Sequence, residues 1–325
     1  MAPEQQKLKM PRRKFLGSLV LGATLLFPHY LNAEESKTTA PSFLSLKQTG
    51  LPKEFKEKGF EIERDWNMNY NKELFIIGEN HEYPNIIDLE SKLIDYLIRE
   101  YKADSLGLEG FYGNLNENLL LRLVNENINP FEEDLKKEFG KETIRSLELK
   151  GYLKKDDEKI KAYEKFFKQL KIPCYGLEEK DLFINTNNII GITKIADYVL
   201  KEKTKYNDIK DIRLLERLFE FLKQRLPREG LLKDQTLESF IQDNYEAKKL
   251  REDFAKVYFD NLINQRNKAF AKNIEDYTKK IDSKRGIIIT GHLHSSFLLA
   301  GFANHDNLQH YLKFNSLIVS SPGTK

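Results

Sequence analysis

The chain has 325 residues, of which 53 are Lys or Arg and 50 are Asp or Glu. Its net charge of +3 comes from the first 33 residues, where five basic side chains stand against one Glu, and that surplus of four leaves −1 for the rest. A nearly neutral body offers no general attraction for nucleic acid or for an anionic membrane surface. The single cysteine, Cys174, excludes intramolecular disulfides and cysteine-rich metal clusters, and the apolar stretch IPCYG predicts that it is a buried core residue.

Residues 1–33 have the layout of a secretory signal: a basic stretch, a short apolar stretch at 16–27, and the small residue Ala33 before two glutamates. The apolar stretch is too short to span a bilayer comfortably. Residues 12–16, RRKFL, resemble a twin-arginine export signal, and the ordinary secretory route stays open. We expect cleavage after Ala33 and export to the periplasm or the cell exterior, without stable membrane insertion afterwards. The alternative is an uncleaved N-terminal anchor.

The remaining chain is expected to fold as an N-terminal entry segment, residues 34–69, loosely held over residues 34–50, followed by a single α/β domain, residues 70–325. Short apolar runs that are continuous rather than alternating are typical of strands buried on both faces of a parallel sheet. The sequence contains five such runs: LFIIG (74–78), SLGLEG (105–110), IPCYGLE (172–178), GIIITG (286–291) and SLIVSS (316–321). They predict a mostly parallel sheet flanked by helices.

Helices are predicted between these strands. In residues 85–102 the apolar side chains repeat at helical spacing, which makes a strand–helix–strand unit with the runs on either side. A second helical pattern, residues 189–203, follows the third strand. The long intervals 114–170 and 204–284 are highly charged and also have helical spacing. Because long structureless loops are uncommon, we expect these two insertions to form a helical cap.

Polar side chains follow the predicted strands at the points where they end. Glu79 and His81 follow the first strand, Glu109 lies at the end of the second, and His292 follows the fourth. Ligands of open parallel sheets bind outside the carboxyl ends of the strands. The alternative is that each polar residue only begins a solvated loop, but the set as a whole favours a shared site.

Arg266 is a further candidate, for a different reason. The stretch 254–281 has an apolar stripe at helical spacing, and Arg266 occupies the position between Leu262 and Phe270 where an apolar residue is expected. A guanidinium facing the core must pair with a carboxylate or an anionic ligand. The alternative is an arginine whose stem packs while its head reaches water.

Four motifs resemble, in their order, those of the superfamily that contains ChaN-like haem-uptake proteins. They are IIGENHEYPN, LGLEGF, QRNKAFAKNI and IIITGHLH. TraB and Tiki proteins belong to it, with erythromycin-esterase-like proteins more distantly. The resemblance spans about residues 70–320, and GLE at 176–178 is similar to TraB proteins. Carried over by motif, it indicates the site residues Gly78, His81, Glu109, Arg266, Asn267, Gly291 and His292. His294 also completes a Gly-x-x-His pattern; we expect His292 to point inward, because His294 lies further into the loop.

Two kinds of hydrolytic chemistry follow from this set. His81, Glu109 and His292 could bind a divalent metal ion, with Glu79 or Glu109 as general base and Arg266 on a substrate carboxylate or an oxyanion. This resembles the metal-dependent peptidase activity of Tiki proteins. Without a metal, His81 would activate water and His292 and Arg266 would be electrophilic, as the erythromycin-esterase resemblance implies. The substrate is expected to be a small molecule or a peptide.

Two non-enzymatic functions remain as alternatives. The ChaN resemblance implies a haem or porphyrin carrier, for which Tyr83 and Tyr112, beside the strand-end motifs, are candidate ligands. The TraB resemblance implies a regulatory protein that binds a peptide. The sequence leaves the oligomeric state open.

Overall fold

The computed structural model describes residues 40–66, 70–80, 83, 85–115, 132–149, 157–201, 208–225, 232, 234–246, 261–295 and 307–324. The predicted export signal and His81 therefore lie outside the described residues. No helix within these ranges is both long and apolar enough to cross a membrane.

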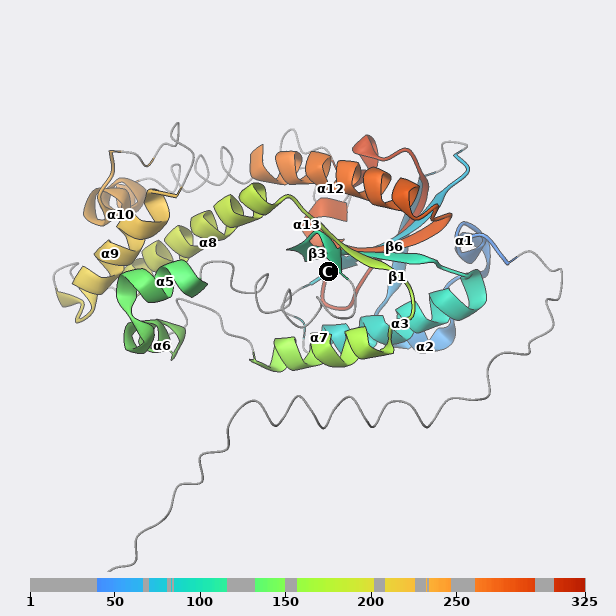
Figure 1. Cartoon of the computed structure of the whole chain (residues 1–325), viewed down its shortest axis with the longest axis horizontal. Helices are drawn as coiled ribbons and strands as arrows, with labels where there is room; N and C mark the ends of the chain where they lie inside the picture. The colour runs from blue at the N-terminus through green and yellow to red at the C-terminus, as the bar shows by residue number, and fades with distance from the viewer. Residues whose placement is uncertain are drawn as a thin grey trace, which may run out of the picture. The chain divides into compact units, whose positions relative to one another are not determined.

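The fold is α/β, and its centre is a mostly parallel sheet (Figure 1). The seven strands described are β1 (Glu61–Trp66), β2 (Glu73–Glu79), β3 (Ser105–Tyr112), β4 (Asn114–Leu115), β5 (Cys174–Glu178), β6 (Arg285–Gly291) and β7 (Asn315–Ser320). Their order in the sheet is β1-β7-β2-β6-β3-β5-β4. The five inner strands are parallel, and β1 and β4 pair antiparallel at the two edges. All five predicted strands are thereby confirmed.

Helices cover both faces of this sheet. The helices nearest to it are α3 (Ile86–Tyr101), α7 (Asp157–Gln169), α12 (Asn261–Lys280), the single turn α13 (His292–Ser295) and the 3-10 turn η4 (Leu308–Tyr311). The others described are α1 (Ser45–Thr49), α2 (Lys53–Glu57), α5 (Glu132–Phe139), α6 (Lys141–Leu149), α8 (Lys180–Lys201), α9 (Ile212–Lys223) and α10 (Leu237–Glu246). Both helices predicted beside strands, around 85–102 and 189–203, are present as α3 and α8.

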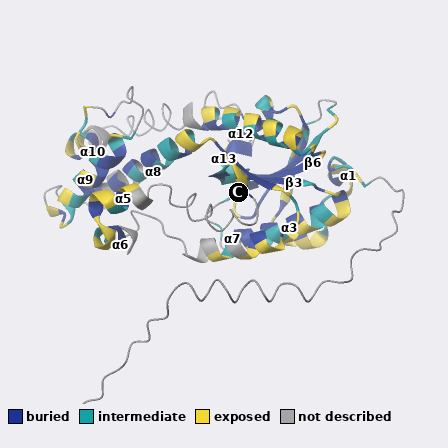
Figure 2. Cartoon of the chain, in the orientation of Figure 1, coloured by how far each residue is buried: buried dark blue, intermediate teal, exposed yellow. Residues whose placement is uncertain are grey.

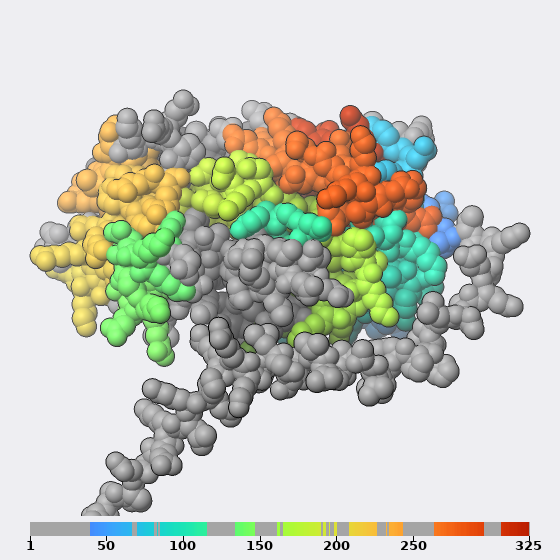
Figure 3. All heavy atoms as spheres, in the orientation of Figure 1, coloured from blue at the N-terminus to red at the C-terminus, as the bar shows by residue number. Residues whose placement is uncertain are grey.

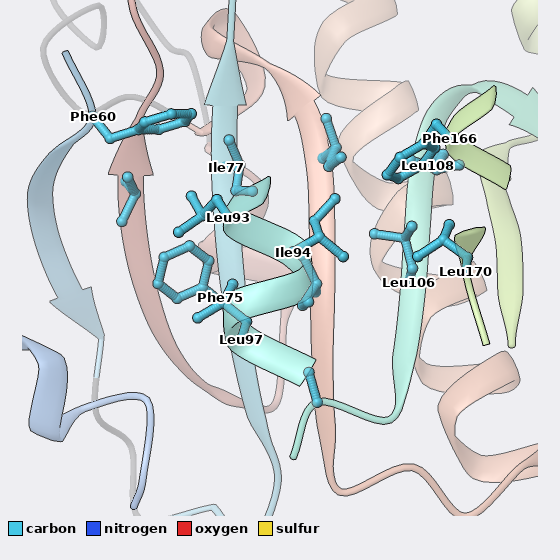
Figure 4. Close-up of a cluster of buried hydrophobic side chains, with 14 of the residues drawn as sticks. Phe60, Phe75, Ile77, Leu93, Ile94, Leu97, Leu106, Leu108, Phe166 and Leu170 are labelled. Carbon is cyan, nitrogen blue, oxygen red and sulfur yellow. The ribbon is translucent and has the colours of Figure 1, made fainter. Parts of the chain in front are cut away.

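Alternate side chains of the inner strands β2, β5, β6 and β7 enter two different hydrophobic cores. Phe75 and Ile77 of β2 belong to the core under α3 and α7, and Figure 4 shows them beside Leu93 and Leu97 of α3. Ile76 belongs instead to the core under α12. Both cores are buried, which explains why the strand sequences are continuously apolar. Figure 2 shows the strands in dark blue and exposed residues along the outer sides of the helices.

The two predicted insertions supply helices, as expected, and these helices take different places in the fold. From the first, α7 packs on the sheet beside α3, and from the second, α12 covers the opposite face. Each of these two helices can cover a face of the sheet because it buries apolar side chains against it. The remaining helices α5, α6, α9 and α10 share a separate hydrophobic cluster with α8. Figure 3 shows α8 (yellow-green) beside α12 (orange), with which it is in contact.

The described part of the N-terminal segment, residues 40–66, differs from the loosely held segment that we expected. Phe43, Phe55 and Phe60 are buried in the core under α3, and the ring of Phe43 lies 5.7 Å from that of Phe75. Burial of each such ring contributes about 1.5–3 kcal/mol. β1 completes the sheet edge by pairing with β7. This segment is therefore part of the domain.

Candidate functional site

A polar cluster lies where the predicted site residues were expected, at the carboxyl ends of the parallel strands. Glu79 ends β2, Glu178 ends β5, and Gly291 ends β6, while β3 contributes Glu109. α12 contributes Arg266 from one face of the sheet. Residues that are far apart in sequence thus meet, because parallel strands bring their carboxyl ends to one edge.

Glu109 holds β3 to β6 at the point where the two strands separate. Backbone pairing between them runs as far as Leu108, and Gly110 then adopts a positive φ of 81°. Oε2 of Glu109 accepts hydrogen bonds from Thr290 Oγ1, at 2.7 Å, and from the backbone N–H of Gly291. The carboxylate replaces strand pairing here, and it fixes the backbone just before His292.

Arg266 is buried between two carboxylates. Its Nε and Nη2 donate to Glu178 Oε2 and Oε1 at 3.2 and 2.5 Å, and Nη2 also donates to Glu109 Oε1 at 2.7 Å. Burial lowers the pKa of the guanidinium, but the charges of Glu178 and Glu109 outweigh it and hold the pKa above the ordinary value. Arg266 is thus a paired core cation, one of the two outcomes that its position in the stripe predicted.

Glu178 was not predicted as a site residue, although the GLE motif contains it. It is 2% exposed, pairs with Arg266, and accepts the backbone N–H of Gly110 at 3.2 Å. Gly176 allows this arrangement, because a Cβ there would collide with the backbone of Phe111 in the irregular part of β3. The signal that could have identified Glu178 is a glutamate at the end of a third buried strand.

His294, and not His292, reaches this cluster, which corrects our expectation. Its Nε2 lies 3.5 Å from Glu109 Oε1, and its Nδ1 lies 2.6 Å from Asn267 Oδ1. The ring is 3% exposed and packs 5.0 Å from that of Phe270. Burial lowers the pKa of His294, although Glu109 acts in the opposite direction. Residues 292–295 form one helical turn, so its third residue, His294, is carried back toward α12 instead of outward.

His292 faces a different carboxylate. Its Nδ1 lies 3.6 Å from Glu63 Oε1 on the edge strand β1, and its side chain is 13% exposed. Burial lowers the pKa of this imidazole as well. The ring lies against Gly78, where a Cβ would come within 3.2 Å of Nδ1 and would collide with Ser295 Oγ. Gly78 thus permits the close approach of His292 and Ser295 to β2.

The other strand-end residues lie beside a small cavity and a tied loop. Glu79, Glu90 and Glu109 line a cavity of about 10 Å³, together with Ile87, Leu108, Phe166 and Ile289. That volume is roughly the room of one water molecule. Asn80 donates from Nδ2 to Gly323 O at 2.7 Å, which ties the loop after β2 to the turn after β7. His81 follows in this loop, outside the described residues.

Of the predicted metal set, Glu109 and His292 are described, and His81 lies outside the described residues. Both oxygens of Glu109 already accept hydrogen bonds, from Arg266 on one side and from Thr290 and Gly291 on the other. Among the residues described, no three His, Cys, Asp or Glu side chains are arranged to hold a metal ion. We therefore derive no step through a metal.

The two tyrosines predicted as haem ligands both make packing contacts. Tyr83 packs against the core under α3, next to the turn at Gly323. Tyr112 packs beside Phe183 of α8 at 6.3 Å, and Lys180 Nζ lies 5.7 Å from its ring centre. These contacts give both rings a packing role.

Comparison with family models, with curated proteins and with solved structures gives no match. The class that the fold and the site define is an α/β protein with a buried Glu–Arg–Glu network and two histidines at the carboxyl edge of a parallel sheet. A function has to be argued from that geometry.

Proposed function

We propose that the chain is a hydrolase of small-molecule or peptide substrates, in which His292 takes the proton from the attacking water. The observation that carries the proposal is a partly exposed imidazole with a lowered pKa at the carboxyl edge of the sheet. A lowered pKa keeps the ring neutral near pH 7, and a neutral ring is the form that can accept a proton.

The Glu109–Arg266–Glu178 network would serve this histidine by fixing the backbone beside it. Glu109 holds Thr290 and Gly291, the two residues before His292, and Arg266 holds Glu109 in turn. The contacts thus run from Arg266 of α12 through Glu109 to Gly291, the residue before His292. General-base catalysis depends on such placement, since an error of about 1 Å can reduce the rate about 100-fold.

This proposal changes the roles that the sequence suggested for two residues. Arg266 has its charge balanced by two carboxylates, so binding a substrate carboxylate would require it to give up one of them. Glu109 accepts hydrogen bonds on both oxygens, which makes it a poor general base. Both are better suited to positioning. The carrier and regulatory alternatives have no specific observation in their favour, and the export prediction is unchanged.

The experiment is a hydrolysis screen of the full chain with aryl esters, phosphate esters and peptide amides, each with and without added divalent ions. We expect turnover of one class, and a loss of about 100-fold or more in His292→Gln, because general-base catalysis contributes roughly 10²–10⁴-fold. The matched control is His310→Gln, since His310 is exposed and lies beside Trp66. Absence of turnover in every class, or equal activity of the two variants, would contradict the proposal.

A further inference from the structure

We infer that Glu63 is a positioning residue for His292, whose Nδ1–H it accepts, so that the lone pair of the ring stays on Nε2. The catalytic meaning of this contact rests on the proposed function. The contact itself rests on the geometry of β1 and α13, and it can be tested without any substrate.

Glu63 is the extra residue of a β-bulge. Ile62 pairs with Val319 of β7, and Arg64 pairs with the neighbouring residue Ile318, so that Glu63 is the added residue between these two pairs. A bulge bends its strand and redirects a side chain, and bulges are common beside active sites. Here the redirected carboxylate reaches past β7 to the ring that lies over Gly78 of β2.

The burial of this carboxylate is unusual for its position. β1 is an edge strand, and its residues Glu61 and Arg64 are exposed, whereas the side chain of Glu63 is only 11% exposed. A buried carboxylate is stabilised by the donors and cations around it. The ring of His292 presents Nδ1 to it at 3.6 Å.

The same atom of His292 needs an acceptor. Within the described part of the chain, Nδ1 is buried and makes no hydrogen bond. The 3.6 Å separation from Glu63 Oε1 is slightly longer than a hydrogen bond, as is common at catalytic contacts before substrate binds. A shift of about 0.5 Å would bring His292 Nδ1 and Glu63 Oε1 within hydrogen-bond distance, since N–H···O bonds reach about 3.2 Å.

This contact decides which nitrogen can act as the base. With the proton on Nδ1 directed to Glu63, the free lone pair is on Nε2. A proton leaving water would pass to Nε2, the resulting hydroxide would attack the substrate, and the proton would later pass to the leaving group. While the ring carries both protons it is a cation, and the carboxylate of Glu63 stabilises it. Glu63 acts through His292 and does not touch the substrate.

The test reads the tautomer of His292 by ¹⁵N NMR of the full chain near pH 7.5, with His292→Gln to assign its signals. We expect the Nδ1–H form in the unaltered protein. Glu63→Gln keeps an oxygen acceptor and should keep this form, whereas Glu63→Leu removes the acceptor and should move the proton to Nε2. Glu61→Leu, on the same strand and exposed, is the matched control and should change nothing.

An Nε2–H form in the unaltered protein would overturn the inference, and this reading needs no variant to fold. An unchanged tautomer in folded Glu63→Leu would overturn it too. If an active substrate class is found, Glu63→Leu should lower kcat about 10- to 100-fold with KM unchanged. A correct tautomer without any hydrolysis would leave the role of Glu63 standing and refute the proposed function, so the two failures are distinguishable.

Discussion

Replacement of Arg266 by Met is the sharpest test of the buried network. Methionine suits the apolar stripe of α12, where Phe270 and Ile274 are buried, but it leaves Glu178 and Glu109 without their cation. Breaking a buried ion pair by removal of one partner costs about 3–5 kcal/mol, because the remaining charge is uncompensated. We therefore expect a folded but destabilised protein, with that loss in the free energy of unfolding.

The assay is urea unfolding followed by circular dichroism, with a thermal scan beside it. At roughly 2 °C per kcal/mol for a chain of this size, Tm should fall by about 6–10 °C. Lys272→Met is the matched control, because Lys272 lies on the same helix in an exposed pair with Asp276, at 75% and 67% side-chain exposure. Its effect should stay within about 0.5 kcal/mol.

A double variant separates charge from packing. Adding Glu178→Gln to Arg266→Met neutralises the carboxylate that lost its partner, so the double variant should recover at least about 1 kcal/mol relative to simple addition of the two single effects. If Arg266→Met costs no more than Lys272→Met, or if the two single effects simply add, then the guanidinium is not held between buried carboxylates and the reasoning fails.

Three further predictions concern other parts of the molecule. Gly78→Ala should cost about 1–3 kcal/mol in urea unfolding, because its methyl group would collide with Ser295 and crowd His292; an unchanged midpoint would contradict that packing. His294 has a pKa lowered by burial, so the unfolded chain binds its proton more readily; stability should be complete above the ordinary value of 6.5 and should fall as pH drops below it. His294→Gln should therefore show a shallower loss between pH 7 and 5, and equal slopes would refute this. Burial raises the pKa of Cys174 to about 12, so a thiol reagent at pH 8 should modify it only after unfolding; rapid modification of the native chain would contradict its burial.

The fold could be predicted where burial imposes a simple pattern. The five inner strands are largely buried, so their sequences contain continuous, mainly apolar runs. The edge strands β1 and β4 were missed for the opposite reason. β1, EIERDW, contains four charged residues because one side of an edge strand is open to water, and β4 has only two residues. The pairing of such strands depends on neighbours far away in sequence.

The site could be predicted only as far as residue type and strand position reach. Glu109 and Arg266 were identified because one ends a buried strand and the other interrupts an apolar stripe. The choice between His292 and His294 depends on the path of a single helical turn. A turn of four residues is too short for a hydrophobic period to indicate which histidine points toward the core. Glu63 could not be identified at all, because its role comes from a bulge that exists only once β1 has paired with β7.

The order of the strands also determines when the sheet can form during synthesis. β2 lies between β6 and β7, and its residues pair with partners made roughly 210 and 240 residues later. At about 5–20 residues per second, a ribosome needs roughly 10–50 s to supply them. During that time β2 has neither neighbour, and such non-local pairing also slows folding itself. The sheet therefore cannot be completed until β7 has been made. Until then, the unpaired strand β2 is accessible to a chaperone or to a translocation channel.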